Sequence, residues 1–201
     1  NRKPEEGVTG VVAICKYGEN GLAMDLTGES PHFGYLLRLA EKKGFAVVAF
    51  GQPARQGWSR TVSSADLSSR DKAAEDRRLA EISREWSQVI KRFAAKHDLP
   101  DKDWLLYGIC GGAQYAHRLA LREPQHFRAV HVHYGGSYDV PTEAGKSILW
   151  LVTTYSDEPA YVAAQKFFRL CKAAGYRIIL KGRGSGPEEE AAPLPVAGGE
   201  V

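Results

Sequence analysis

The stretch Trp104-Leu105-Leu106-Tyr107-Gly108-Ile109-Cys110-Gly111-Gly112 decides the fold. Its apolar first part, residues 104–107, predicts a strand, and the residues after it carry alanines at helical spacing, at 113, 116 and 120. Glycines on both sides of Cys110 allow the backbone to turn tightly between the two elements. The stretch therefore predicts a strand, a sharp turn and a helix, with the side chain of Cys110 held beyond the edge of a sheet.

The rest of the chain alternates between apolar strands and amphipathic helices. The strands are expected at residues 8–14, 45–50, 104–107, 127–133, 148–154 and 176–180. Helices are expected at residues 31–43, 71–97, 113–123 and 161–174. This alternation predicts an α/β protein, a doubly wound and mostly parallel sheet of about six strands with helices on both faces. We expect one domain at residues 1–181, followed by a loosely ordered tail rich in Gly, Pro and Glu at residues 182–201.

The composition excludes several classes of partner. The 27 basic and 24 acidic residues give a net charge of +3 and are interspersed, so no nucleic-acid partner is expected. No apolar run approaches the roughly 20 residues of a membrane span. The three cysteines lie far apart, which argues against disulfides and favours a cytoplasmic protein, although the start at Asn1 leaves a removed leader open. Neither a metal-ligand spacing nor a phosphate-binding glycine loop is visible, so no cofactor and no metal is expected.

Cys110 is the strongest candidate for a catalytic residue in the sequence. A thiol at the N-terminus of a helix meets the positive end of the helix dipole, which lowers its pKa and favours the nucleophilic thiolate. The alternative is a small, buried, apolar cysteine that only packs. That alternative fits Cys15, at the end of a strand, and Cys171, on the apolar face of a helix.

With the alternation and the Gly-x-Cys-x-Gly turn together, residues 7–181 resemble the α/β-hydrolase superfamily, in particular its dienelactone-hydrolase-like and small esterase members. The resemblance implies that Cys110 is the catalytic nucleophile and that the N–H of Gly111 stabilises the oxyanion. It assigns the second oxyanion N–H to Tyr17 and the triad acid to Asp157. An ordinary turn at Tyr17 and a helix cap at Asp157 are the structural alternatives.

The histidine of the expected triad is absent from its usual place. No histidine follows Asp157, and Ser185 occupies the corresponding position in the loop after the last strand. His133, at the end of the strand beside the turn, is the best substitute as catalytic base. His131 points to the same face of the sheet as His133 but lies one pleat deeper, and His32 lies near the start of the first helix. The remaining candidates of interest, His117 and His126, are predicted to be exposed.

Three interpretations follow from these residues. The first is a hydrolase of ester, lactone or thioester bonds with a cysteine nucleophile, acting on a small ester-like molecule. The second is a pseudoenzyme, a catalytically impaired relative that binds a small molecule or a protein. The third is an altered or shortened form of an active enzyme. In the first two, Trp58 and Tyr134 are expected to line a pocket that takes a partly apolar acyl or aryl group.

Overall fold

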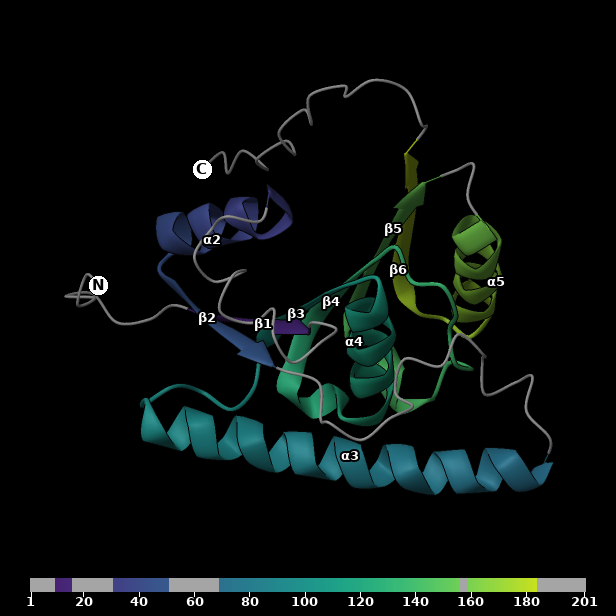
Figure 1. Cartoon of the computed structure of the whole chain (residues 1–201), viewed down its shortest axis with the longest axis horizontal. Helices are drawn as coiled ribbons and strands as arrows, with labels where there is room; N and C mark the ends of the chain where they lie inside the picture. The colour runs from purple at the N-terminus through teal and green to yellow at the C-terminus, as the bar shows by residue number, and fades with distance from the viewer. Residues whose placement is uncertain (1–9, 16–30, 51–68, 156–158, 184–201) are drawn as a thin grey trace.

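The structure is a computed structural model that describes residues 10–15, 31–50, 69–155 and 159–183. Its centre is one parallel sheet with the strand order β2-β1-β3-β4-β5-β6 (Figure 1). The strands are β1 (Gly10–Cys15), β2 (Phe45–Phe50), β3 (Trp104–Ile109), β4 (Phe127–His133), β5 (Leu149–Tyr155) and β6 (Arg177–Arg183). All five neighbouring pairs are parallel, which confirms the α/β class and the parallel sheet predicted from the alternation.

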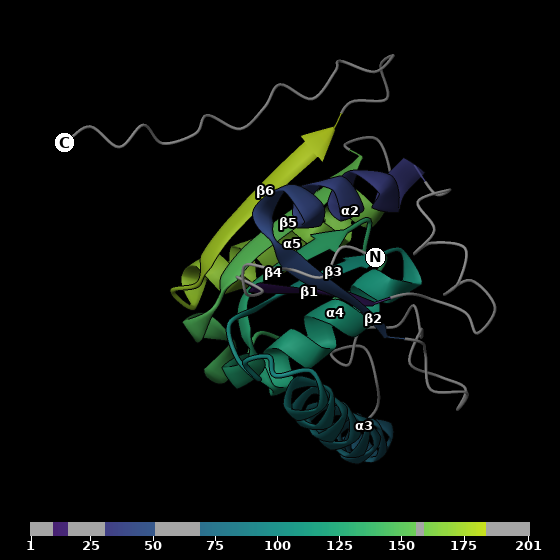
Figure 2. The same cartoon turned by 90° about the vertical axis from the view of Figure 1, so that its left-hand side faces the viewer.

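Helices cover both faces of this sheet. They are α2 (Pro31–Lys43), α3 (Ser69–Lys96), α4 (Gly111–Arg122) and α5 (Pro159–Ala173), and two short 3-10 turns, Pro124–His126 and Ala144–Ser147, lie between α4 and β5. Figure 2 shows α2 on one side of the sheet and α3 with α4 on the other. No helix among the described residues is long and apolar enough to cross a membrane.

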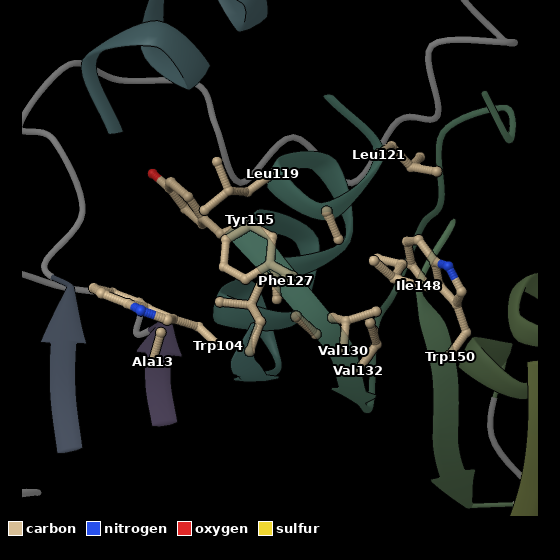
Figure 3. Close-up of a cluster of buried hydrophobic side chains, with 14 of the residues drawn as sticks. Ala13, Trp104, Tyr115, Leu119, Leu121, Phe127, Val130, Val132, Ile148 and Trp150 are labelled. Carbon is tan, nitrogen blue, oxygen red and sulfur yellow. The ribbon is translucent and has the colours of Figure 1, made fainter. Parts of the chain in front are cut away.

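The main core lies between the sheet and the helices α3, α4 and α5. Alternate residues of the strands point into it, among them Trp104, Val130 and Trp150 (Figure 3). Tyr115 and Leu119 of α4 meet them from the helix side. Burying these large apolar side chains supplies most of the favourable free energy of folding.

The opposite face of the sheet is covered unevenly. There α2 packs against β2, and Leu36 of α2 belongs to a small cluster with Val12 and Tyr107. Residues of β5 and β6 that alternate with the main core point to this side, and Leu149 and Ile179 remain 44% and 57% exposed. The two faces of the sheet therefore differ strongly in how much apolar surface they bury.

The ends of two elements differ from the sequence-based expectation. Strand β3 continues to Ile109, directly before Cys110. Strand β6 continues to Arg183, because Gly182 and Arg183 pair with Thr154 and Tyr155 of β5. The first two residues of the expected tail thus belong to the sheet, and residues 184–201 lie outside the described part. The domain boundary itself stays a prediction.

Candidate functional site

Cys110 stands at a sharp turn between β3 and α4. Its backbone angles are φ 52° and ψ −122°, a conformation that L-residues rarely adopt and that costs about 1–3 kcal/mol. Two main-chain hydrogen bonds hold it there. The Cys110 N–H donates to the carbonyl oxygen of His133 at 3.1 Å, and the Ala113 N–H donates to the carbonyl oxygen of Cys110 at 3.0 Å. The residue is exposed at the carboxyl end of the strands.

Gly108 is needed because α4 crosses very close to β3 at this turn. A β-carbon added to Gly108 would lie 2.3 Å from the carbonyl oxygen of Gly112 and 2.8 Å from the β-carbon of Ala116. Neither distance is tolerable, and one of the obstructing atoms is backbone. The sharp strand-turn-helix predicted around Cys110 is confirmed, and the close approach explains the glycine at position 108.

The acidity of the Cys110 thiol runs against the expectation from the helix dipole. Although the residue as a whole is exposed, partial burial of its sulfur raises the pKa of the thiol above its ordinary value. At neutral pH the group is therefore protonated, and it needs a base to become a strong nucleophile. Cys171 is fully buried, as predicted for a packing residue, and burial raises its pKa to about 12. The side chain of Cys15 lies outside the described part.

Two histidines on β4 share one hydroxyl group. His133 Nδ1 lies 2.7 Å and His131 Nε2 lies 2.8 Å from Oγ1 of Thr153, a residue of the adjacent strand β5. Burial, and secondarily the charge of His133, lower the pKa of His131 to about 4, so that it is neutral near pH 7. These two contacts occupy Nδ1 of His133 and Nε2 of His131.

His117 and His126 are buried, and the prediction that they are exposed is wrong. His117 Nδ1 donates to the carbonyl oxygen of Ala113, and its Nε2 accepts a hydrogen bond from the Asp139 N–H at 3.0 Å. His126 is bound between the Ser87 hydroxyl and a backbone carbonyl. Burial lowers the pKa of His117, which agrees with a neutral ring that holds one proton. Both histidines therefore serve the fold, and neither is a candidate base.

A buried ion-pair network between α4 and the segment after β4 was not predicted from the sequence. The Arg118 guanidinium donates to Asp139 Oδ1 at 3.2 Å, and Arg122 donates to Oδ2 at 3.3 Å. Burial alone would raise the pKa of Asp139, but the neighbouring charges hold it well below its ordinary value. We attribute this mainly to Arg118, because Nε2 of His117 accepts a hydrogen bond from the Asp139 N–H and has no proton to donate to the carboxylate. The network fixes the segment after β4 to α4.

Four of the predicted site residues lie together where β3 and β4 end. Gly111 is the first residue of α4, where backbone N–H groups have no acceptor within the helix. Tyr134 follows His133 directly, and its N–H donates to the carbonyl oxygen of Thr153 at 2.8 Å. Its ring centroid lies 5.9 Å from that of Tyr155. Cys110, Gly111, His133 and Tyr134 thus share one edge of the sheet.

Three predicted site residues, Tyr17, Trp58 and Asp157, lie outside the described residues, as does the side chain of His32. Their assigned roles stay predictions. In the described ranges there is no group of three or more His, Cys, Asp or Glu side chains that is placed to hold a metal ion.

Solved structures of esterases share this architecture. A thermostable esterase matches with a TM-score of 0.61 and 14% identity over 92% of this chain, which spans 49% of that protein. The carboxylesterase of Bacillus cereus matches with a TM-score of 0.60 and 14% identity over 90% of this chain and 84% of its own. A phospholipase/carboxylesterase from Dyadobacter fermentans gives 0.58 and 16%, over 90% and 83%.

These likenesses identify the architecture as an α/β-hydrolase fold. The sequence itself matches no protein-family model, and no curated protein is significantly similar to it. Because the identities are near 15%, the comparisons establish the fold and not the reaction.

Proposed function

We propose that this protein hydrolyses an ester, lactone or thioester bond through a covalent intermediate on Cys110. The observation that carries this proposal is the backbone of Cys110, which is held at φ 52° by hydrogen bonds on both sides and placed at the exposed turn between β3 and α4. A strained conformation of this kind persists only where surrounding contacts impose it, and such positions cluster at active sites. The esterase structures that share the fold agree with this choice of reaction.

The proposed reaction has two halves. The sulfur of Cys110 attacks the carbonyl carbon while its proton passes to His133, and the electron pair of the C=O bond moves to oxygen. The N–H groups of Gly111 and Tyr17 stabilise that oxyanion. The C–O bond then breaks, and the leaving alcohol takes the proton from His133. Water attacks the resulting thioester in the same way and releases the acid and the Cys110 thiol.

The position of His133 supports its role as the proton acceptor. Its carbonyl oxygen accepts the hydrogen bond from the Cys110 N–H, so the two residues are direct neighbours across β3 and β4. Catalytic hydrogen bonds are often long before substrate binds and shorten in the complex. A thiol with a raised pKa needs such a base more than a thiolate would, because it starts the reaction protonated.

Nearby rings indicate the kind of substrate. Tyr134 and Tyr155 meet edge to face next to His133, whose ring centroid lies 6.3 Å from that of Tyr155. Together with Trp58 they would give the site an aromatic wall, which favours a partly apolar acyl or aryl group.

The nucleophile is tested with p-nitrophenyl acetate and the variants Cys110→Ala and Cys110→Ser. We expect Cys110→Ala to lose the release of p-nitrophenol above background, and Cys110→Ser to keep a slower reaction because the backbone holds residue 110 in place. Mass spectrometry of the quenched wild type should show one acetyl group on Cys110. Full rate in Cys110→Ala would exclude Cys110 as the nucleophile.

A second candidate function is a binding module that has lost catalysis. It is favoured by the raised pKa of Cys110, which leaves the thiol protonated at neutral pH. Thermal stabilisation by phenyl acetate, without turnover and without acetylation, would support this candidate. An initial burst that stops after one equivalent would instead indicate acylation without deacylation.

A further inference from the structure

The hydroxyl of Thr153 lies between two imidazole rings that come from one strand. Thr153 is the direct partner of His133 in the pairing of β4 with β5, and His131 lies two residues earlier on the same face. The nitrogen-to-oxygen distances of 2.7 Å and 2.8 Å make both contacts good hydrogen bonds. One oxygen atom therefore connects the candidate base with a second, more deeply placed histidine.

The single proton of the hydroxyl couples the protonation of the two rings. A hydroxyl donates one hydrogen bond, so Thr153 donates to one imidazole and accepts from the other. In the first arrangement, His133 carries its proton on Nδ1 and donates a hydrogen bond to the Thr153 oxygen, and the Thr153 hydroxyl donates a hydrogen bond to Nε2 of His131. In the second arrangement, both directions are reversed and the proton of His133 lies on Nε2. Only the first arrangement leaves a lone pair on Nε2 of His133.

Protonation of His133 during catalysis selects between these arrangements. A fully protonated imidazole has N–H groups on both nitrogens, so its Nδ1 must then donate to the Thr153 oxygen. The hydroxyl can respond by donating to His131, which can accept because burial keeps it neutral. The first arrangement is thus the one in which His133 takes up a proton at Nε2 without rearranging its partners.

We propose that Thr153 is a positioning residue, which holds the His133 ring and sets its Nδ1–H tautomer so that Nε2 is the base for Cys110. This inference rests on the proposed hydrolase function. The mechanism needs no carboxylate on His133, because an accepted hydrogen bond also stabilises the charged ring. It gives His131 a role as the acceptor that completes the hydrogen-bond chain.

Two tyrosine rings contact the histidines of this chain of hydrogen bonds, one from β3 and one from β5. The ring of Tyr107 meets that of His131 at 5.0 Å, and burial raises the pKa of Tyr107 to about 12, so it is neutral. Tyr155 contacts His133 from β5. The Cys110 thiol is neutral as well below its raised pKa. His131 is likewise neutral near pH 7.

The experiment compares Thr153→Val with Thr153→Ser and Thr154→Val, using the rate of the first p-nitrophenol release from p-nitrophenyl acetate between pH 5 and 9. Valine keeps the β-branched shape and removes the hydroxyl, whereas serine retains it. Thr154 is a matched control, since its hydroxyl is buried on the other face and has no hydrogen-bond partner in the described structure. Thermal unfolding of each variant establishes that it is folded.

We expect Thr153→Val to lower the plateau rate by about 10- to 100-fold, within the usual contribution of a positioned base. The acidic limb of its pH profile should move to lower pH by about half a unit to one unit, because the charged ring loses an accepted hydrogen bond. Thr153→Ser and Thr154→Val should stay within about threefold of the wild type. A purely structural role of Thr153 would lower the rate without moving the limb.

Imidazole ¹⁵N NMR spectra of the protein without substrate measure the tautomer of His133 directly. The wild type and Thr153→Ser should carry the His133 proton on Nδ1, and Thr153→Val should shift it toward Nε2. An unchanged limb and tautomer in Thr153→Val, with a Cys110-dependent rate, would overturn the role of Thr153 and leave the hydrolase function intact. A rate that survives Cys110→Ala would overturn the hydrolase function first, and this inference with it.

Discussion

Arg118 is a charged residue with a side chain only 1% exposed, in the middle of α4. Its position is possible because Asp139, 3% exposed, pairs with it and also accepts from Arg122. A buried ion pair adds little net stability relative to an apolar replacement, but removal of one partner is costly because the other charge is left buried. The network therefore matters most for fixing the segment after β4.

Asp139→Ala is expected to lower the free energy of unfolding by about 3–5 kcal/mol, since it leaves Arg118 buried without its carboxylate. Urea denaturation at pH 7 measures this. Asp76→Ala is the control, because Asp76 pairs with Arg122 at the solvent-exposed end of the same network and is 49% exposed. It should change stability by less than about 0.5 kcal/mol. Similar losses in both variants would contradict the view that burial makes Asp139 important.

The burial of His117 and Arg118 illustrates what the sequence does not reveal. A polar side chain on a helix is ordinarily predicted to face solvent, and α4 would then bury only its alanines and leucines. In the structure, every residue of α4 from Gly112 to Leu121 is buried. The cause is the segment after β4, whose Tyr138 stacks on Phe167 of α5. Such a contact joins residues far apart in sequence and has no periodic signature.

Helix α4 and strand β3 form the most sensitive pair of elements. Gly108→Ala should lower the free energy of unfolding by about 1–3 kcal/mol, because its β-carbon meets the backbone of Gly112 and the helix has to move. The same movement should lower the reactivity of Cys110 toward p-nitrophenyl acetate. Gly136→Ala is the control, since its β-carbon would lie 3.7 Å from the nearest atom. Urea denaturation compares the free energies of unfolding of the two variants. An unchanged free energy of unfolding in Gly108→Ala would contradict the close approach of α4 to β3.

The elements themselves follow closely from the sequence. The expected strands at residues 45–50 and 127–133 coincide with β2 and β4. The run at 45–50 is apolar throughout, whereas 127–133 alternates buried apolar residues with less buried ones such as Arg128 and His131. The helix expected at residues 71–97 is α3, which runs from Ser69 to Lys96. The hydroxyl of Thr153 between two histidines could not be predicted, since it depends on the register between β4 and β5 and on rotamers.

At the scale of the whole molecule, the site lies where the strand order changes direction. The chain adds β2 on one side of β1 and then crosses to place β3 on the other side, after which each strand follows the last. In open α/β sheets, ligands bind at the carboxyl ends of the strands beside such a change. Cys110 follows β3 directly, which places the proposed nucleophile at this location.

The whole molecule should lose stability as the pH falls below the ordinary histidine pKa of 6.5. The pKa of His131 is lowered to about 4 in the folded state, so the unfolded state binds more protons between pH 6.5 and about 4, and unfolding is favoured there. The lowered pKa of His117 acts in the same direction below pH 6.5. The slope should approach about 1.4 kcal/mol per pH unit for each histidine. Asp139 adds to the loss below pH 3.8, where its carboxylate is protonated first in the unfolded chain.

Urea denaturation at pH 7.5, 6.0 and 4.5 measures this dependence. His131→Gln should reduce the slope, because glutamine does not titrate in this range. A free energy of unfolding that stays constant from pH 7.5 to 4.5 would contradict the neutral, buried state of these histidines.

The two main-chain hydrogen bonds at Cys110 fix the position of the reactive group independently of the chemical identity of the side chain. The His133 carbonyl and the Ala113 N–H fix the backbone of residue 110, and neither contact involves the sulfur. The β-carbon of any L-residue at this position would therefore leave the turn in the same direction. Replacing the side chain therefore changes the acidity and the nucleophilicity of the group but not its location. The reactivities of cysteine, serine and selenocysteine at position 110 can then be compared on the same backbone.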